Sequence, residues 1–177
     1  MTVQAEHAEI AALLQEGDRK EVARAGDVAA HVLAHPEAAG ALLDCLKDGD
    51  ATVKSHAAHA LMQVAKADPD VLQAHVDRIF KEMGPDTQWE VREQFSKIVA
   101  RLQLTKEQGK EAARLFSLYM KDKSSIVRTC ALQGVYDLAE AGLYPRDKAK
   151  DFISHPLAHG GSKAMAARAR KLLAEFT

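Results

Sequence analysis

Histidines are the residues of this sequence whose type and spacing could most readily bind a metal ion. His31 and His35 lie four positions apart, and His56 and His59 lie three apart, so each pair would share one face of a helix. Two imidazoles on one helical face can bind zinc or nickel. No acidic or thiol ligand completes either set at a recognisable spacing. We therefore expect ordinary histidines, with no bound metal and no cofactor.

Motifs of known enzyme chemistry are missing from the sequence. It contains no glycine-rich phosphate loop, no GxSxG nucleophile elbow and no HExxH zinc motif. The two cysteines, Cys45 and Cys130, have no CxxC spacing. Both lie in apolar helical patterns, where a thiol acts as a small hydrophobic group. We therefore expect a protein without enzymatic activity.

Three segments of the chain align without gaps and predict three similar helices. They begin at Val53, Val91 and Val127. In each segment, apolar or small residues recur at a spacing that places them on one face of a helix. A second apolar helical pattern precedes each segment, so the sequence predicts repeated helix pairs. The preceding patterns cover about 37–47, 70–83 and 106–121.

The repeats predict a single domain that spans residues 1–177. The first residues would form a capping pair with helices at about 4–15 and 19–34, because end repeats need a polar outer face. Met165 continues the apolar spacing loosely and predicts a degenerate last repeat. The expected segments are the cap 1–35, the repeats 36–68, 69–104 and 105–141, and the degenerate repeat 142–177.

An acidic residue precedes a basic residue by six positions in three of the repeats. The pairs are Asp48 with Lys54, Asp86 with Arg92, and Asp122 with Arg128. The aspartate would lie in a turn and the base in the first turn of the next helix, within reach of the following repeat's aspartate. We predict a ladder of ion pairs that fixes the register between repeats, each link contributing about 0–1 kcal/mol where exposed.

The Asp-x5-Arg pattern, with Val before the base and Ala or Leu positions after it, resembles the HEAT repeat. The resemblance covers about 37–141 well and 145–177 loosely. It implies an all-α fold, a right-handed α-α superhelix of about four to five stacked antiparallel helix pairs, with the second helices on the concave side. Lys54 departs from the usual Arg, which weakens bidentate pairing. Gly160 and Ala166 replace the Asp and Arg of the last repeat, so the ladder should stop there.

A binding surface is expected on the exposed side of these second helices. Its mixture of small and a few large side chains suits a partner helix or extended peptide better than a polyanion. Trp89 is the only tryptophan, and tryptophan commonly anchors interfaces. Burial against an adjacent turn is the alternative for Trp89, and contact with a neighbouring repeat is the alternative for the others. The residues predicted to bind a partner are Met62, Trp89, Glu93, Leu132, Tyr136 and Arg170.

Two functional hypotheses follow. The first is a non-enzymatic scaffold or adaptor that binds another protein or peptide along the concave face. The second rests on residues 88–93, QWEVRE, which are similar to a segment of HEAT-like alkylpurine DNA glycosylases and imply DNA binding. That family is larger and basic, with a catalytic Asp in its groove. Here the net charge is −1, and no Asp is evident on the inward side of the second helices, so we expect no nucleic-acid partner.

The composition is that of an ordinary globular protein, with 47% hydrophobic and 28% charged residues. No apolar run approaches the ~20 residues that a membrane helix needs. The first ten residues lack the basic segment and the long apolar stretch of a signal peptide. Two cysteines do not indicate a disulfide framework. We therefore expect a cytoplasmic protein without membrane attachment.

Overall fold

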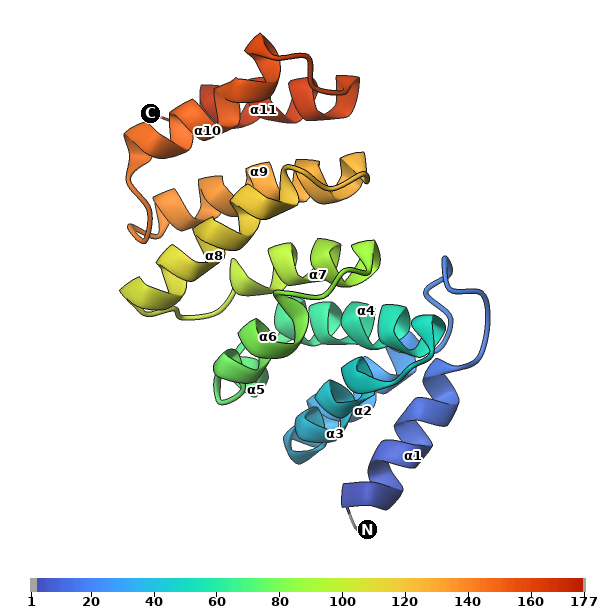
Figure 1. Ribbon diagram of the computed structural model, residues 1–177. Helices are drawn as coiled ribbons and strands as arrows, with labels where there is room; N and C mark the ends of the chain where they lie inside the picture. Colours follow the sequence, from blue (N-terminus) through green and yellow to red (C-terminus); the bar gives the residue numbers. More distant parts are fainter. Residues whose placement is uncertain (1–2, 177) are drawn as a thin grey trace. The chain divides into compact units, whose positions relative to one another are not determined.

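The protein is helical throughout the part of the chain that the structure describes. The computed structural model describes residues 3–176, in which the regular elements are all helices and no strand occurs (Figure 1). The predicted all-α class is therefore confirmed. Within the same residues, no helix has both the length and the apolar character needed to cross a membrane.

The helices form two compact units, Met1–Gln103 and Leu104–Thr177. The predicted single domain over 1–177 and the bounds of its repeats stay predictions. The N-terminal unit contains α1 (Val3–Leu14), α2 (Ala25–Ala34), η1 (Pro36–Ala38), α3 (Ala39–Asp44), η2 (Cys45–Lys47), α4 (Ala51–Ala67), α5 (Asp70–Gln73), α6 (Val76–Met83) and α7 (Trp89–Val99). The C-terminal unit contains α8 (Lys106–Tyr119), α9 (Ser125–Glu140), α10 (Arg146–Ala158) and α11 (Lys163–Glu175).

Helix α4 forms the centre of the N-terminal unit, where it packs against α2 and α7. Its apolar residues recur every three or four positions, so one broad face is buried. Phe95 of α7 contributes the largest buried side chain on that helix and meets the ring of Phe80 edge to face, 5.4 Å between centroids. Burial of this apolar face is the main favourable contribution to holding α4 and α7 together.

In the C-terminal unit, α9 packs against α8, α10 and α11. Gly134 allows α9 to approach α8 closely, because a Cβ built at this position would lie 2.5 Å from the Phe116 ring. The reference valines of the repeats, Val53, Val91 and Val127, are all buried, in agreement with the predicted apolar faces.

The turns before α4, α7 and α9 share one local interaction. Asp48, Asp86 and Asp122 each accept a hydrogen bond at Oδ1 from the backbone N–H two residues later, at 2.9, 2.8 and 2.8 Å. Aspartate favours such turns because its short side chain mimics a backbone turn. The recurrence of aspartate in the sequence therefore has a local cause, which is the shape of the turn that precedes each of these helices.

The second helix of the predicted cap is shorter than expected. The sequence pattern predicted a helix over 19–34, but α2 begins at Ala25 and residues 15–24 form a loop. Gly17 has a φ of +86°, and Ala23 also has a positive φ. Left-handed backbone at these positions is incompatible with a continuous right-handed helix. The loop 15–24 contributes residues to the candidate site.

The two cysteines differ in their surroundings. Cys45 is buried, and burial raises the pKa of its thiol to about 12. The Cys45 side chain therefore acts as a small hydrophobic group, as predicted. Cys130 on α9 is partly exposed.

Candidate functional site

A pocket of about 300 Å³ lies in the N-terminal unit, where the loop 15–24 meets α4 and α7. We call it the Trp89 pocket. It contains two of the residues predicted to bind a partner, Trp89 and Glu93, and both are partly exposed. The lining residues are Arg19, Lys20, Glu21, Val22, Ser55, His59, Trp89, Glu90, Glu93, Gln94 and Lys97.

The position of Trp89 is set by the segment that leads into α7. Trp89 is the first residue of this helix, and the preceding Gln88 has extended backbone. Gln88 Nε2 donates to the Ala51 carbonyl at 2.7 Å, and the Gln88 N–H donates to Asp86 at 2.8 Å. These bonds tie the start of α7 to the start of α4, and they fix the backbone next to Trp89, whose side chain lines the pocket.

Glu90 is a buried carboxylate in this pocket, with only 6% of the residue exposed. The nearest cation is Arg19 on the loop, whose Nε lies 3.1 Å from Glu90 Oε1. Neither oxygen of Glu90 receives a hydrogen bond of acceptable geometry, although the charges are at ion-pair distance. A buried carboxylate is costly unless it is both paired and hydrogen-bonded. The Arg19 contact meets only the first of these requirements.

Gln94 adds a second buried acceptor one helical turn further along α7. The residue is 4% exposed, and its Oε1 has no hydrogen-bond partner. A buried polar atom without a partner costs about 1–3 kcal/mol. Since Gln94 lines the Trp89 pocket together with Glu90, three acceptor oxygens are held there without a donor.

The loop that brings Arg19 to the pocket is fastened to α4 by two side chains. His56 is fully buried, and its Nδ1 and Nε2 lie 2.7 and 3.0 Å from the carbonyl oxygens of Leu14 and Asp18. Ser55 Oγ donates to the Arg19 carbonyl at 3.1 Å. A neutral imidazole can donate only one of the two bonds, and the protonated ring donates both. The buried His56 ring therefore holds the loop against α4.

The remaining charges of the pocket are largely matched. Lys97 Nζ lies 2.6 Å from Glu93 Oε1, one turn apart on α7. His59 faces this pair from α4, and its pKa is lowered from the ordinary value, first by burial and then by the positive charge of Lys97. The pocket is therefore balanced in charge around a buried carboxylate, whose ion pair among residues 3–176 is with the partly exposed Arg19.

The other residues predicted to bind a partner do not lie in this pocket. Leu132 was predicted at the surface but is fully buried, because α9 is packed on by several helices and this position faces one of them. Tyr136 is partly exposed and lies against Phe176, 4.7 Å between ring centroids. Arg170 on α11 is exposed and Met62 on α4 is partly exposed, so the partner roles of these two stay predictions.

One link of the predicted ion-pair ladder is present within the N-terminal unit. Lys54 Nζ lies 2.6 Å from Asp86 Oδ2, so the base at the start of α4 reaches the aspartate of the next turn. Arg92 donates from Nε to the Asp86 carbonyl at 2.5 Å. The link from Arg92 to Asp122 would join the two units and stays a prediction. Gly160 stands at the sequence position where an Asp partner for Arg128 would be expected, and the buried Nε of Arg128 has no hydrogen-bond partner among residues 3–176.

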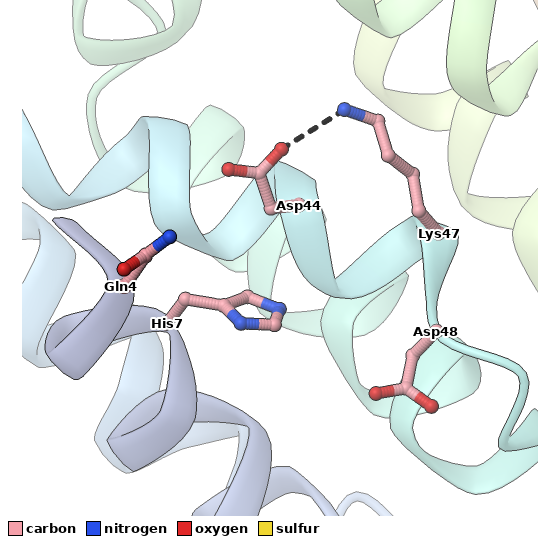
Figure 2. Close-up of a pocket in the computed structure, with 5 residues that line it drawn as sticks. All are labelled: Gln4, His7, Asp44, Lys47 and Asp48. Atoms are coloured by element: carbon pink, nitrogen blue, oxygen red, sulfur yellow. Dashed lines mark hydrogen bonds and ion pairs between the residues drawn. The ribbon is translucent and has the colours of Figure 1, made fainter.

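A second pocket in the N-terminal unit lies between α1 and residues 44–48 (Figure 2). Gln4 and His7 line it from α1, and Asp44 and Lys47 line it from the other side, joined by an ion pair of 3.0 Å. Asp44 is also bound by Arg78 at 2.9 Å, so this carboxylate is matched by two cations. The buried Nε2 of His7 has no hydrogen-bond partner among residues 3–176. This second pocket lacks the buried, unpartnered carboxylate that marks the Trp89 pocket.

Sequence reasoning identified Trp89 and Glu93 but missed Glu90, Gln94 and Arg19. Glu90 was unremarkable because acidic residues are common in the first turn of a helix. Gln94 carried a usable signal: it falls within the apolar stripe of α7, where a polar side chain must be buried. Arg19 could not be found, because its segment was predicted to be helical.

Known proteins do not extend these observations. Comparison of the sequence with protein-family models finds no match, and a search of curated proteins finds no relative. Among residues 3–176, no group of three or more His, Cys, Asp or Glu side chains is arranged to hold a metal ion.

Proposed function

We propose that this chain is a non-enzymatic module of HEAT-like helix pairs that binds a partner protein or peptide, and that the Trp89 pocket is part of its binding surface. The observation that carries the proposal is the buried Glu90 carboxylate, 6% exposed and without a hydrogen-bond donor, beside a partly exposed tryptophan. Desolvated polar groups next to a large aromatic residue are typical of the energetic centre of an interface.

The cost of these unpartnered groups supports a binding role. A fold gains nothing from burying acceptors that it does not satisfy, and replacing them with apolar groups of similar shape is often neutral or stabilising. A partner that supplies donors to Glu90 and Gln94 would recover this free energy on binding. The same groups reject partners that lack such donors, so they also provide specificity.

Two features support the HEAT-like arrangement of helix pairs. The aspartate turn recurs at Asp48, Asp86 and Asp122 with the same hydrogen bond. The Lys54–Asp86 ion pair joins two successive predicted repeats. The aspartate turn recurs at the spacing from which the repeats were predicted, and the ion pair joins one pair of these repeats. A right-handed superhelix with the second helices on its concave side is part of this proposal.

The proposal is tested by comparing the partners captured by the wild type and by pocket variants. Trp89→Ala and Glu90→Gln should lose a partner that the wild type captures. Glu107→Gln, an exposed residue of α8 in the other unit, should retain it and serves as the matched control. Identical recovery by all four proteins would place the binding surface elsewhere.

The DNA-binding hypothesis has a separate test. A short DNA duplex is titrated at low salt and again at higher salt. The cations that line the Trp89 pocket are balanced by its carboxylates, so it offers a polyanion no net positive charge and we expect no binding. Saturable binding that weakens steeply with salt would instead support the glycosylase-like alternative.

A further inference from the structure

We propose that the Trp89 pocket binds an arginine side chain of the partner. In the free protein, the chain's own Arg19 pairs with the Glu90 carboxylate until the partner's arginine displaces it. This inference rests on the proposed function and specifies the chemistry of the partner. It starts from two buried side chains, Glu90 and Gln94, whose acceptor oxygens have no hydrogen bond.

The acceptor oxygens of the pocket that lack a hydrogen bond determine which chemical groups a bound side chain must supply. Glu90 Oε1, Glu90 Oε2 and Gln94 Oε1 are all acceptors, so the guest must bring N–H or O–H donors. One of the two side chains is a carboxylate, and a positively charged donor forms the stronger bond to it. Gln94 is 4% exposed and lines the pocket, so the demand for donors does not depend on the acidic residues alone.

The resident group shows which cation fits. Arg19 approaches Glu90 with Nε at 3.1 Å, yet it makes no well-formed hydrogen bond there. Its side chain is 41% exposed, whereas that of Glu90 is 7% exposed. The contact is therefore made by a side chain that remains partly in solvent. A guanidinium that enters more fully could use several of its five N–H groups.

The anchoring of the loop allows Arg19 to leave without unfolding it. The backbone around Arg19 is held by Ser55 and His56 through the carbonyls of Leu14, Asp18 and Arg19. Only the long, exposed side chain needs to change rotamer for Glu90 to become available. Exchange of one arginine for another keeps Glu90 neutralised at the end of the process, so no buried charge is left unpaired.

Trp89 favours arginine over lysine at this position. The indole lines the same pocket and is partly exposed. Indole is the strongest aromatic partner for a cation, and a planar guanidinium can stack on it while it donates to acceptors at its edge. The compact, strongly hydrated ammonium group of lysine cannot do both.

The test uses the fluorescence of Trp89, which is the only tryptophan of the chain and therefore reports on this pocket alone. The probe is the peptide Ac-Ala-Ala-Arg-Ala-Ala-NH2, with citrulline in place of arginine as an uncharged isostere. The arginine peptide should give a saturable change, and the citrulline peptide should bind at least about tenfold more weakly. Equal responses to the two peptides would overturn the inference.

Two variants test the displacement of Arg19. Arg19→Ala removes the competitor and should bind the arginine peptide roughly 3–10-fold more tightly than the wild type. Glu90→Gln should bind it at least about tenfold more weakly. If Arg19→Ala is unstable because Glu90 is unpaired, its melting temperature should rise when the arginine peptide is added, and no rise would count against the inference.

The outcomes separate this inference from the proposed function. A partner that is captured by the wild type and lost by Glu90→Gln, combined with no preference for arginine over citrulline, would retain the function and reject the arginine guest. Loss of both results would reject both proposals. Stronger binding of a lysine peptide than of the arginine peptide would also contradict the assignment.

Discussion

Helices α4 and α7 place polar side chains at the same repeat position and use them differently. His56 and Gln94 each follow the reference valine of their helix by three residues, and both are buried. Both ring nitrogens of His56 lie against backbone carbonyls, whereas Oε1 of Gln94 has no partner. The partnered group holds the loop of the same unit. The unpartnered group lines the pocket that we propose to bind a partner.

The same repeat position therefore holds a side chain that stabilises the fold in α4 and a side chain without a partner for its oxygen in α7. A fully satisfied buried polar group rigidifies the fold, while an unsatisfied one costs free energy until a ligand arrives. The two helices are neighbours in the N-terminal unit, so they share the loop 15–24: α4 fixes its backbone and α7 receives its Arg19 side chain. Substitution of each group in turn tests this difference between the two helices.

Removal of the partnered group should have the largest effect on stability. His56→Ala removes the contacts of the ring with two loop carbonyls and leaves a cavity, so we expect the free energy of unfolding to fall by about 2–4 kcal/mol. Chemical denaturation monitored by circular dichroism measures this change. A loss below about 1 kcal/mol would show that His56 does not hold the loop.

The ion pair between the two helices should contribute less. Lys54→Met keeps the length of the side chain but leaves Asp86 without its cation, and both partners are mostly buried. We expect a loss of about 1 kcal/mol in the free energy of unfolding, since such pairs lie between exposed and buried ones. Lys110→Met removes an exposed pair with Glu107 and should change stability far less. Equal losses would contradict the ladder.

Removal of the unpartnered group should have the opposite sign. Gln94→Met preserves the approximate shape of the side chain and removes the buried acceptor, so the free energy of unfolding should stay constant or rise by up to about 1 kcal/mol. The same variant should bind the arginine peptide more weakly. If Gln94→Met destabilises the protein as strongly as His56→Ala, the distinction between the two positions fails.

Acid should weaken the contact between α4 and α7 through His59. Its folded-state pKa is lowered from the ordinary 6.5, first by burial and then by Lys97, with Glu93 opposing and the neighbouring His56 adding slightly. The unfolded chain therefore takes up the proton first as the pH falls, and the stability present above about 6.5 decreases below it.

Urea denaturation across a pH series measures this effect, which should be the smallest of the four. His59→Gln should lose less stability than the wild type when the pH is lowered from about 7.5 to about 5. His75, whose pKa is lowered mainly by burial, should preserve part of the acid sensitivity in this variant. Identical slopes for the two proteins would show that His59 is not involved.

Much of the helical framework could be predicted from the sequence, because it depends on local periodicity. The helices that begin near Val53, Val91 and Val127 are recognisable from their apolar spacing alone. The aspartates before them were identified as partners of basic residues, and Lys54–Asp86 is such a pair. Their hydrogen bonds to the turn backbone were not predicted, because the residue type alone does not show whether an aspartate pairs with a base, bonds to the turn backbone or does both.

The candidate site was only partly predictable, because it depends on a loop and on burial between helices. Trp89 was identified from its rarity, but the loop 15–24 was mistaken for helix, and Arg19 was lost with it. Leu132 was predicted at the surface because the spacing of one helix does not show how many helices pack on it. Contacts between segments distant in sequence are the information that periodicity lacks.

The difference between the two cysteines, together with the single tryptophan, allows each compact unit to carry one spectroscopic label. Thiol-reactive dyes attack the thiolate, so Cys45, with its pKa raised to about 12 by burial, should resist modification while the partly exposed Cys130 reacts. A single maleimide dye would then report on the C-terminal unit and the indole of Trp89 on the N-terminal one. The wild-type sequence, labelled with the dye at Cys130, thus allows the unfolding of both units to be followed in one sample.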